Sequence, residues 1–398
     1  MPEIRPFKGV LYNPERVRIE DVVAPPYDVI PPQEQEIYRS LSPYNIVHIA
    51  LEPDYAEAAR RFERWLEEGV LVRDPAPSLY VYRREYRFEG EDRVDLGFIA
   101  LMRIPEGEGE VLPHEETFEG PKKDRLLLLQ HVRANLSPVF LLYEDPTGEI
   151  GRALREAISG RPPRIELVKE RVAHALWSVP DDDLASGISR LLGCSKLIIA
   201  DGHHRFESAR IYRDMMRSLS SNPTGEEGFN FVMCYFADVS SPGLLILPTH
   251  RIALGVDPAE VELRIEERFE AEEVWGLGEM FALMRRSEGI CIGIFDGERL
   301  RVARFKGGGL EGVPEVLREL DVVILHRLLI PPEARVEFTR DPQEVIHAVI
   351  ENPSSYGFFL NPIDPRLVKR VALAGHKMPH KSTYFYPKPL SGLVINKH

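Results

Sequence analysis

Cysteine is scarce in this chain of 398 residues, and the three that occur, Cys194, Cys234 and Cys291, lie far apart. They form no CxxC pair, so the sequence indicates neither a disulfide framework nor a cysteine zinc site. Long apolar runs are missing too, and residues 1–5 lack the apolar core of a signal peptide. We therefore expect a soluble protein of the reducing cytoplasm, with no membrane partner.

Positive charge is in deficit, with 50 Lys and Arg against 63 Asp and Glu and a net charge of −13. This balance argues against a sequence-independent nucleic-acid binder, which needs a broad basic surface, but it allows one local basic pocket. The chain has no GxxxxGK[ST] loop and no GxSxG elbow, which excludes P-loop NTPases and the usual serine hydrolases. A GxGxxG match at residues 307–312 follows a strand that alternates with charge, which favours a surface turn over a dinucleotide site.

The hydrophobic content of 43% and charged content of 28% are typical of a globular protein. The length is too great for one ordinary core and indicates several domains. We expect an N-terminal α/β region over residues 1–145, a central region over 146–254, and a C-terminal α/β region over 255–398.

Periodicity predicts the main elements. Apolar residues at helical spacing predict a helix over 55–68, and alternation predicts an antiparallel pair of strands over 79–88 and 97–104. The proline-rich segment 24–43 indicates ordered loops, because proline fixes φ and pushes its predecessor to extended geometry. A helical pattern also covers residues 314–320.

The most informative stretch is the polar turn at residues 200–205, which follows the apolar run 197–199 and precedes a helical pattern. A helix N-terminus offers free N–H groups and the positive end of the helix dipole. Cationic side chains there reinforce a site for phosphate or carboxylate. A helix start that is merely polar is the alternative. We assign Gly202 and Arg205 to phosphate binding, and the expected catalytic residues are Asp201, His203 and His204.

Three further clusters mix hydroxyls, imidazoles and charges at the ends of predicted elements. Glu115 lies near cations and is our candidate general base, because nearby cations favour an ionised carboxylate. A solvated loop or a structural strand end is the alternative for each cluster. The residues expected to contribute to phosphate or nucleotide binding are His114, Thr117, Lys122, Asp124, Arg125, Thr249, His250, Arg251, Lys381, Ser382 and Thr383.

The run at residues 200–205 resembles the Asp-Gly-His-His-Arg box of ParB/sulfiredoxin-like domains, in particular that of archaeal ADP-dependent free serine kinases. Further marks along the chain, among them residues 24–29 and 378–388, resemble a widespread bacterial and archaeal family. The resemblance implies a mixed α/β fold with a ParB/sulfiredoxin-like sheet core and additional α/β elements. It also implies that the turn binds nucleotide phosphates, and we expect Tyr27, Asp28 and Asn45 to contact the substrate. Sulfiredoxins carry a reactive cysteine where this chain has His203, which argues against thiol repair.

The residues and the resemblance together predict a phosphotransferase that acts on a small hydroxyl metabolite such as serine, with ADP or ATP as donor. Asp201 would hold Mg²⁺ or orient a histidine. Two alternatives stay open. One is a phosphatase or other metal-assisted hydrolase with Asp201, His203 and His204 as ligands. The other is a non-catalytic, ParB-like nucleotide-binding regulator.

Overall fold

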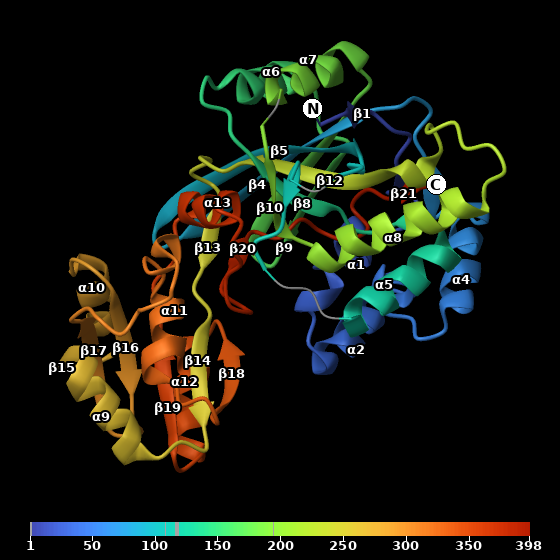
Figure 1. The fold of residues 1–398 in the computed structure, drawn as a ribbon. Helices are drawn as coiled ribbons and strands as arrows, with labels where there is room; N and C mark the ends of the chain where they lie inside the picture. The colour runs from blue at the N-terminus through green and yellow to red at the C-terminus, as the bar shows by residue number, and fades with distance from the viewer. Residues whose placement is uncertain (1, 108, 116–118, 194) are drawn as a thin grey trace. The chain divides into compact units, whose positions relative to one another are not determined.

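The chain folds into two compact units in the computed structural model, which describes residues 2–107, 109–115, 119–193 and 195–398 (Figure 1). Unit 1 comprises Met1–Pro113, Thr117–Leu244 and Pro387–His398, and unit 2 comprises His114–Glu116 and Leu245–Tyr386. The C-terminal segment therefore returns to unit 1. The division into three regions that the sequence analysis expects stays a prediction.

Unit 1 contains a nine-stranded mixed sheet with the strand order β6-β11-β8-β12-β5-β4-β10-β9, and β1 pairs with β5. The pairs β11–β6 and β12–β8 are parallel and the other pairs are antiparallel. This arrangement confirms the predicted mixed α/β class. The strands of this sheet are β1 (Ile4–Arg5), β4 (Leu79–Phe88), β5 (Glu91–Arg103), β6 (Val111–Leu112), β8 (Val139–Tyr143), β9 (Ile165–Lys169), β10 (Val172–Val179), β11 (Leu197–Asp201) and β12 (Phe231–Asp238).

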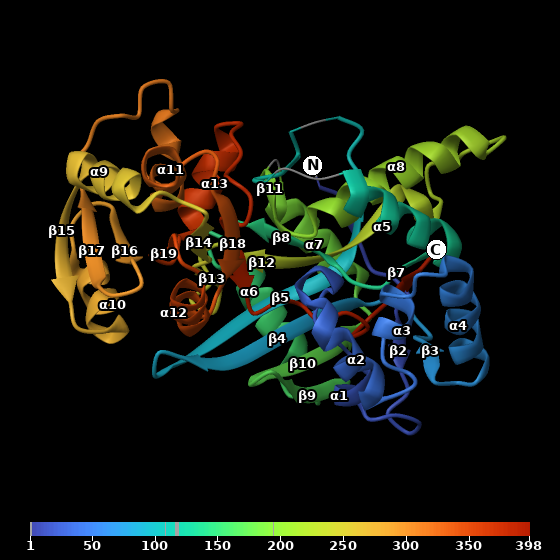
Figure 2. The same ribbon diagram turned by 90° about the horizontal axis from the view of Figure 1, so that it is seen from below.

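Two short strand pairs and the helices complete unit 1. Strand β2 (Val10–Tyr12) pairs with β3 (Leu71–Arg73), and β7 (Ala134–Asn135) pairs with β21 (Asn396–Lys397) near the C-terminus. Helix α5 packs against both α4 and α8 (Figures 1 and 2). The helices are α1 (Ile19–Val22), α2 (Pro32–Leu41), α3 (Val47–Ala50), α4 (Tyr55–Glu67), α5 (Glu119–Val132), α6 (Glu149–Ile158), α7 (Asp182–Leu192) and α8 (His203–Leu219).

Local sequence explains the elements that were predicted. Helix α4 begins after Asp54, whose carboxylate caps two backbone N–H groups, and it buries Ala58, Phe62 and Trp65 on one face. The antiparallel pair β4–β5 has the predicted pairing, although β5 starts earlier than expected, at Glu91. Apolar residues of the central strands and of α6, α7 and α8 form one core.

The prediction of loops throughout residues 24–43 is wrong in its second half, because α2 occupies Pro32–Leu41. Pro32 is the first residue of this helix. At that position the missing N–H would have had no helical partner, and the fixed φ of proline already matches the helix. The pair Pro31-Pro32 therefore begins a helix instead of preventing one.

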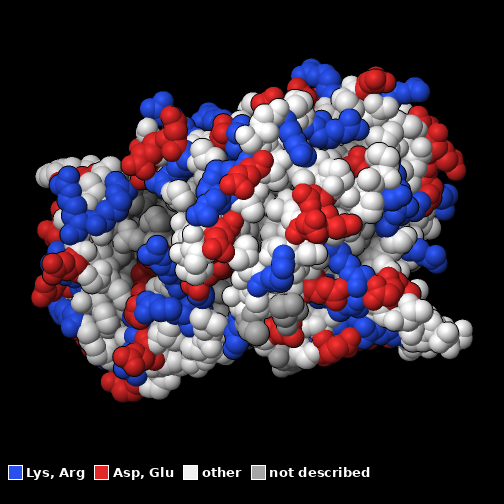
Figure 3. Space-filling model, turned by 90° about the horizontal axis from the view of Figure 1, so that it is seen from above, with Lys and Arg blue, Asp and Glu red and all other residues white. Residues whose placement is uncertain are grey.

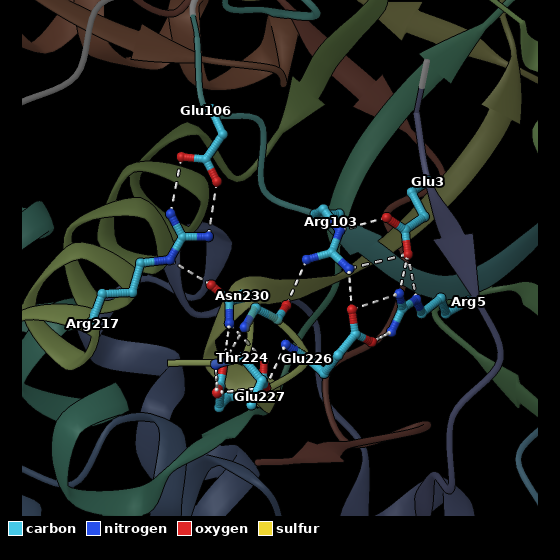
Figure 4. Close-up of polar contacts among 10 residues, drawn as sticks. Glu3, Arg5, Arg103, Glu106, Arg217, Thr224, Glu226, Glu227 and Asn230 are labelled. Carbon is cyan, nitrogen blue, oxygen red and sulfur yellow. Dashed lines mark hydrogen bonds and ion pairs between the residues drawn. The ribbon is translucent and has the colours of Figure 1, made fainter. Parts of the chain in front are cut away.

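A polar network at the edge of unit 1 joins the N-terminal strand to the loop that follows α8 (Figure 4). Glu226 accepts hydrogen bonds from Arg5 and Arg103, which also pair with Glu3. Arg217 of α8 donates to Asn230 at 2.7 Å in the same loop region. The two guanidiniums of Arg5 and Arg103 also lie 4.5 and 4.6 Å from the centroid of the Phe231 ring. All of these are structural contacts.

Unit 2 contains a six-stranded antiparallel sheet with the order β15-β17-β16-β19-β14-β18. Strands β13 and β20 form a separate two-stranded sheet. The strands are β13 (Leu245–Leu247), β14 (His250–Leu254), β15 (Phe269–Val274), β16 (Cys291–Phe295), β17 (Leu300–Phe305), β18 (Arg335–Thr339), β19 (Ser355–Phe359) and β20 (Tyr384–Tyr386). The helices are α9 (Pro258–Arg268), α10 (Leu277–Arg286), α11 (Asp321–Ile324), α12 (Pro342–Glu351) and α13 (Pro365–Leu373).

Two predictions made from the sequence concern residues of unit 2. The GxGxxG match at residues 307–312 follows β17, which pairs antiparallel with both of its neighbours, so it does not belong to a parallel βαβ unit. The helix predicted over 314–320 is wrong, since only a single 3₁₀ turn forms over Glu315–Leu317. Pro314 directly precedes this turn, and none of the three residues in the turn is buried, so tertiary packing gives a longer helix little support.

Candidate functional site

The polar turn at the end of β11 has the predicted form of strand, glycine and helix. Strand β11 ends at Asp201, Gly202 is the N-cap of α8 with φ +86°, and the helix begins at His203. A Cβ at Gly202 would lie 2.9 Å from both Cζ and Nε of Arg205. Glycine is therefore required twice, for the left-handed backbone and for the close approach of the guanidinium.

Asp201 is paired with two cations. Its Oδ2 accepts a hydrogen bond from Nη2 of Arg205 at 2.6 Å, and its Oδ1 accepts one from Nζ of Lys388. Burial alone would raise the pKa of Asp201, but Lys388 and Arg205 lower it to about 2. Because one carboxylate is shared by two cations, Asp201, Arg205 and Lys388 together carry a net positive charge.

Arg205 is the most constrained member of this group. Its side chain is 10% exposed, and its Nη1 donates to the carbonyl of Pro138. Its Nε is buried and has no hydrogen-bond partner among the described residues. Burial opposes the charge of Arg205, but Asp201 raises its pKa, so the guanidinium stays protonated. A buried N–H without a partner is costly, and a ligand atom would relieve that cost.

Arg205 lines a pocket of unit 1 with a free volume of about 60 Å³. Arg125 and Tyr27 also line it, and the Arg125 guanidinium lies 4.0 Å from the centroid of the Tyr27 ring. Ser137, Ser208 and Asn135 add polar groups, while leucine, valine and alanine side chains form the rest of the wall. Since one water molecule needs roughly 10–15 Å³ of such space, the pocket fits a few waters or one phosphate-sized group.

The segment 122–125, in α5, contributes to this pocket mainly through Arg125. Asp124 accepts from Nε of Arg125 at 2.7 Å and from the Tyr55 hydroxyl at 2.7 Å, so it orients the arginine. Lys122 pairs with Glu119, and its backbone carbonyl accepts from Ser208. The phosphate contact predicted for the Lys122 side chain stays a prediction.

The remaining unit 1 candidates differ in exposure. His203 is buried and His204 is half-buried, whereas Asp28 is exposed. Asn45 is fully buried, and its amide donates to the carbonyl of Asp21 and accepts from the N–H of Val47. It therefore organises the start of α3, and the substrate contacts predicted for Asn45 and Asp28 stay predictions.

Unit 2 gathers a second set of predicted residues around Thr383. The Thr383 hydroxyl lies 2.8 Å from Nε2 of His114 and donates to Oε1 of Glu115 at 3.0 Å. The His114 side chain is completely buried. This arrangement links two clusters that are far apart in the sequence. Thr117 lies outside the described residues.

Arg251 holds the turn that precedes Thr383. It is completely buried, and its Nη2 donates to the carbonyl of Lys381 at 2.9 Å while its Nη1 donates to that of Thr249. Burial lowers the pKa of Arg251 to about 10. Ser382 donates to the carbonyl of Pro379 within the same turn. These contacts go to backbone carbonyls, and the phosphate contacts predicted for Arg251, Lys381 and Ser382 stay predictions.

His250 begins β14 and lies in the interior of unit 2. Its Nδ1 accepts a hydrogen bond from the N–H of Leu360 at 3.3 Å, and burial lowers its pKa to about 4. The neutral imidazole is thereby favoured at neutral pH.

Lys388 contributes to the site, although it is not among the residues expected there. It belongs to residues 378–388, one of the family marks in the sequence, but its partner Asp201 is 187 positions away in the sequence. Only folding brings the two side chains together, and the basic composition of the segment was the available signal.

The described part of the chain shows no set of three His, Cys, Asp or Glu side chains that could hold a metal ion. Both carboxylate oxygens of Asp201 are engaged by cations, which would repel a divalent ion. Asp201 in this geometry therefore does not fit the predicted Mg²⁺ site.

The distribution of surface charge indicates whether the protein resembles a nucleic-acid binder. On the face shown in Figure 3, Lys and Arg side chains are interspersed with Asp and Glu. This differs from the continuous positive surface that a sequence-independent nucleic-acid binder needs.

A search of the described helices finds none with both the length and the apolar composition to cross a lipid bilayer.

Comparison with solved structures finds distant similarity. SbnI with a C-terminal truncation from Staphylococcus aureus matches with a TM-score of 0.39 and 12% identity, over 74% of this chain and 85% of that chain. A conserved hypothetical protein from Pyrococcus furiosus matches with a TM-score of 0.33 and 15% identity, over 70% and 89%. A free serine kinase in complex with AMP matches with a TM-score of 0.34 and 15% identity, over 69% and 83%. These scores are too low to carry a functional argument.

The sequence comparisons are of two kinds. A search of curated proteins returned no match. The family model described as "Protein of unknown function (DUF1015)" matches residues 4–323, most of the chain, so this protein belongs to the DUF1015 family.

Proposed function

We propose that unit 1 binds the phosphate group of a small molecule in the pocket beside Arg205. We further propose that the protein is a phosphotransferase that uses ADP or ATP to phosphorylate a small hydroxyl metabolite such as serine. The observation that carries the first proposal is the state of Arg205. It is a permanently charged guanidinium that lines a pocket, its side chain is only 10% exposed, and its buried Nε has no hydrogen-bond partner among the described residues.

Charge supports an anion as the occupant. Lys388 shares the carboxylate of Asp201 with Arg205, which leaves the Asp201–Arg205 pair with one extra cation. The carboxylate of Asp28 also acts electrostatically on Arg205 and offsets part of that charge. Arg125 supplies a second guanidinium to the same pocket, and guanidinium forks match the geometry of phosphate oxygens. The start of α8 lies directly beside Arg205 and adds the positive end of a helix of 17 residues.

Pocket size supports a phosphate group as the part that enters. The pocket has room for a few water molecules, which is also room for one phosphate group. Phosphoryl transfer suits such a site, because its catalysis depends mainly on positioning and charge neutralisation. The roles predicted for Glu115 and for the other unit 2 residues stay predictions.

One observation favours the non-catalytic alternative. The described residues that line the pocket include no carboxylate. The nearby Asp124 and Asp201 are both paired with arginines, and Asp201 has a pKa of about 2, far below the range of an effective general base. A nucleotide-binding regulator needs the phosphate pocket but no base, so this reading remains the second candidate.

Calorimetric titration with inorganic phosphate and with ADP tests the binding proposal. Arg205→Gln should weaken phosphate binding by about tenfold or more, since a charge-assisted hydrogen bond is worth at least that factor. Arg210→Gln is the matched control, because Arg210 lies on the same helix but is 39% exposed and pairs with Glu207. Equal effects of the two variants, or no phosphate binding by the native protein, would contradict the proposal.

Phosphorus NMR separates the two candidate functions. The native protein is incubated with serine and with ADP or ATP, and the spectrum is followed for phosphoserine. Formation of phosphoserine that is lost in Arg205→Gln supports the transferase. Nucleotide binding without any new phosphorus signal supports the regulator.

A further inference from the structure

A completely buried ion pair lies in the central sheet of unit 1. Arg84 of β4 and Asp95 of β5 are cross-strand partners, and neither side chain has any exposed surface. Nε of Arg84 donates to Oδ2 of Asp95 at 3.2 Å, and its Nη2 donates to the Tyr235 hydroxyl at 3.0 Å. The Arg84 guanidinium also lies 4.5 Å from the centroid of the Tyr235 ring and 5.3 Å from that of Phe140.

Stability alone is a weak explanation for this pair. Removing two charges from water costs several kcal/mol each, and apolar residues of similar volume often serve a core as well or better. The informative contact is the one that joins this ion pair to a distant segment of the chain. Nη1 of Arg84 donates to the backbone carbonyl of Pro387, which is 303 positions away in the sequence.

Pro387 immediately precedes Lys388, the lysine that pairs with Asp201. The Lys388 side chain is 8% exposed and its amine contacts Oδ1 of Asp201. An unbroken series of contacts thus runs from Asp95 through Arg84, the Pro387 carbonyl and Lys388 to Asp201. From there it reaches Arg205 in the pocket wall.

The segment beyond Lys388 is also anchored near the pocket. Ser391 exchanges two backbone hydrogen bonds with Ala24, and its hydroxyl lies 2.6 Å from that of Ser137 in the pocket wall. The N–H of Gly392 donates to the carbonyl of Leu136, another pocket residue. Arg84 supplies the corresponding anchor on the other side of Lys388.

We propose that Arg84 is a positioning residue for the phosphate pocket, and this rests on the function proposed above. By holding the Pro387 carbonyl, it fixes the backbone that delivers the Lys388 amine to Asp201. Without Lys388, Asp201 and Arg205 form a neutral pair. With Lys388 in place, the group keeps the positive charge that attracts an anion.

A double-mutant cycle on the full chain tests this inference. The variants are Arg84→Lys, which keeps the buried charge beside Asp95 but shortens the reach to Pro387, Lys388→Met, and their combination. Calorimetry with inorganic phosphate measures the affinity of each. Arg84→Lys should weaken binding about tenfold in the native background and have no further effect in Lys388→Met, because coupled residues act through one interaction. Additive losses would overturn the inference.

A double variant tests the same inference with a lower risk of misfolding. Arg84→Met combined with Asp95→Asn removes both buried charges together, which avoids leaving one of them unpaired. It should weaken phosphate binding at least as much as Arg84→Lys does. Native-like affinity in this folded double variant would overturn the inference.

A labelling measurement does not depend on phosphate binding. Reductive methylation of Lys388, followed by peptide mapping, should be several times faster in Arg84→Lys than in the native protein, while Lys397 reacts equally in both. An unchanged Lys388 rate would overturn the positioning role. If the native protein binds no phosphate but the Lys388 rate rises, the proposed function fails and the positional link stands.

Discussion

Replacing Gly202 by alanine is the sharpest structural perturbation of the candidate site. Gly202 has φ +86°, and a Cβ there would lie 2.9 Å from Cζ and Nε of Arg205. That guanidinium cannot move aside without losing its hydrogen bonds to Pro138 and Asp201. The substitution therefore combines backbone strain with displacement of the residue on which the proposed function depends.

The magnitude follows from two contributions. An L-residue in the left-handed region costs about 1–2 kcal/mol relative to glycine. Overpacking against a constrained side chain adds about 1–3 kcal/mol. Gly202→Ala should thus lower the free energy of unfolding by about 2–5 kcal/mol, and it should also weaken phosphate binding.

Gly148→Ala is the matched control. Gly148 is likewise the N-cap of a helix, α6, with φ +69°, but a Cβ there meets no atom within 4 Å. Only the backbone contribution of about 1–2 kcal/mol should appear, with phosphate affinity unchanged. Urea unfolding of both variants measures the difference. Equal losses of stability would refute the claim that the Arg205 guanidinium occupies the space above Gly202.

Three further predictions concern individual contacts. Asp201 has a folded pKa of about 2, below its ordinary 3.8, so it stabilises the fold above its ordinary pKa and that contribution is lost as the pH falls towards 2. Asp201→Asn should cost about 2 kcal/mol in neutral urea unfolding and converge with the native protein in acid; a constant difference at all pH values would contradict this. Thr383→Val should destabilise unit 2 by about 1–3 kcal/mol in thermal unfolding, because buried His114 loses a partner; an unchanged melting temperature would contradict it. Glu226→Gln, in the network of Figure 4, should cost stability only at low salt; a salt-independent loss in urea unfolding would be inconsistent with an exposed ion-pair network.

The sequence predicted the parts of the structure that depend on short-range patterns. The strand-glycine-helix turn around Gly202 was predictable because an apolar run, a glycine and a helical period follow one another. The pair β4–β5 was predictable from alternation, and α4 from its apolar face. In each case the residues that determine the element are close together in the chain.

Features that depend on long-range packing were not predictable in the same way. The return of residues 387–398 to unit 1 and the ion pair of Lys388 with Asp201 depend on how distant segments meet. Alternation in β4 and β5 identified strands but not the buried pair of Arg84 and Asp95, because charged residues in alternating strands usually face water. The proline-rich composition of residues 24–43 predicted loops, but Pro32 occupies the first turn of α2, where proline is compatible with a helix.

A crystal structure of the protein with ADP would show whether the pocket beside Arg205 binds phosphate. We expect a phosphate oxygen within hydrogen-bonding distance of Nε of Arg205, inside the pocket that Arg125 and Tyr27 also line, with Lys388 still beside Asp201. Nucleotide bound elsewhere on the chain, with the Arg205 pocket filled only by water, would contradict this expectation.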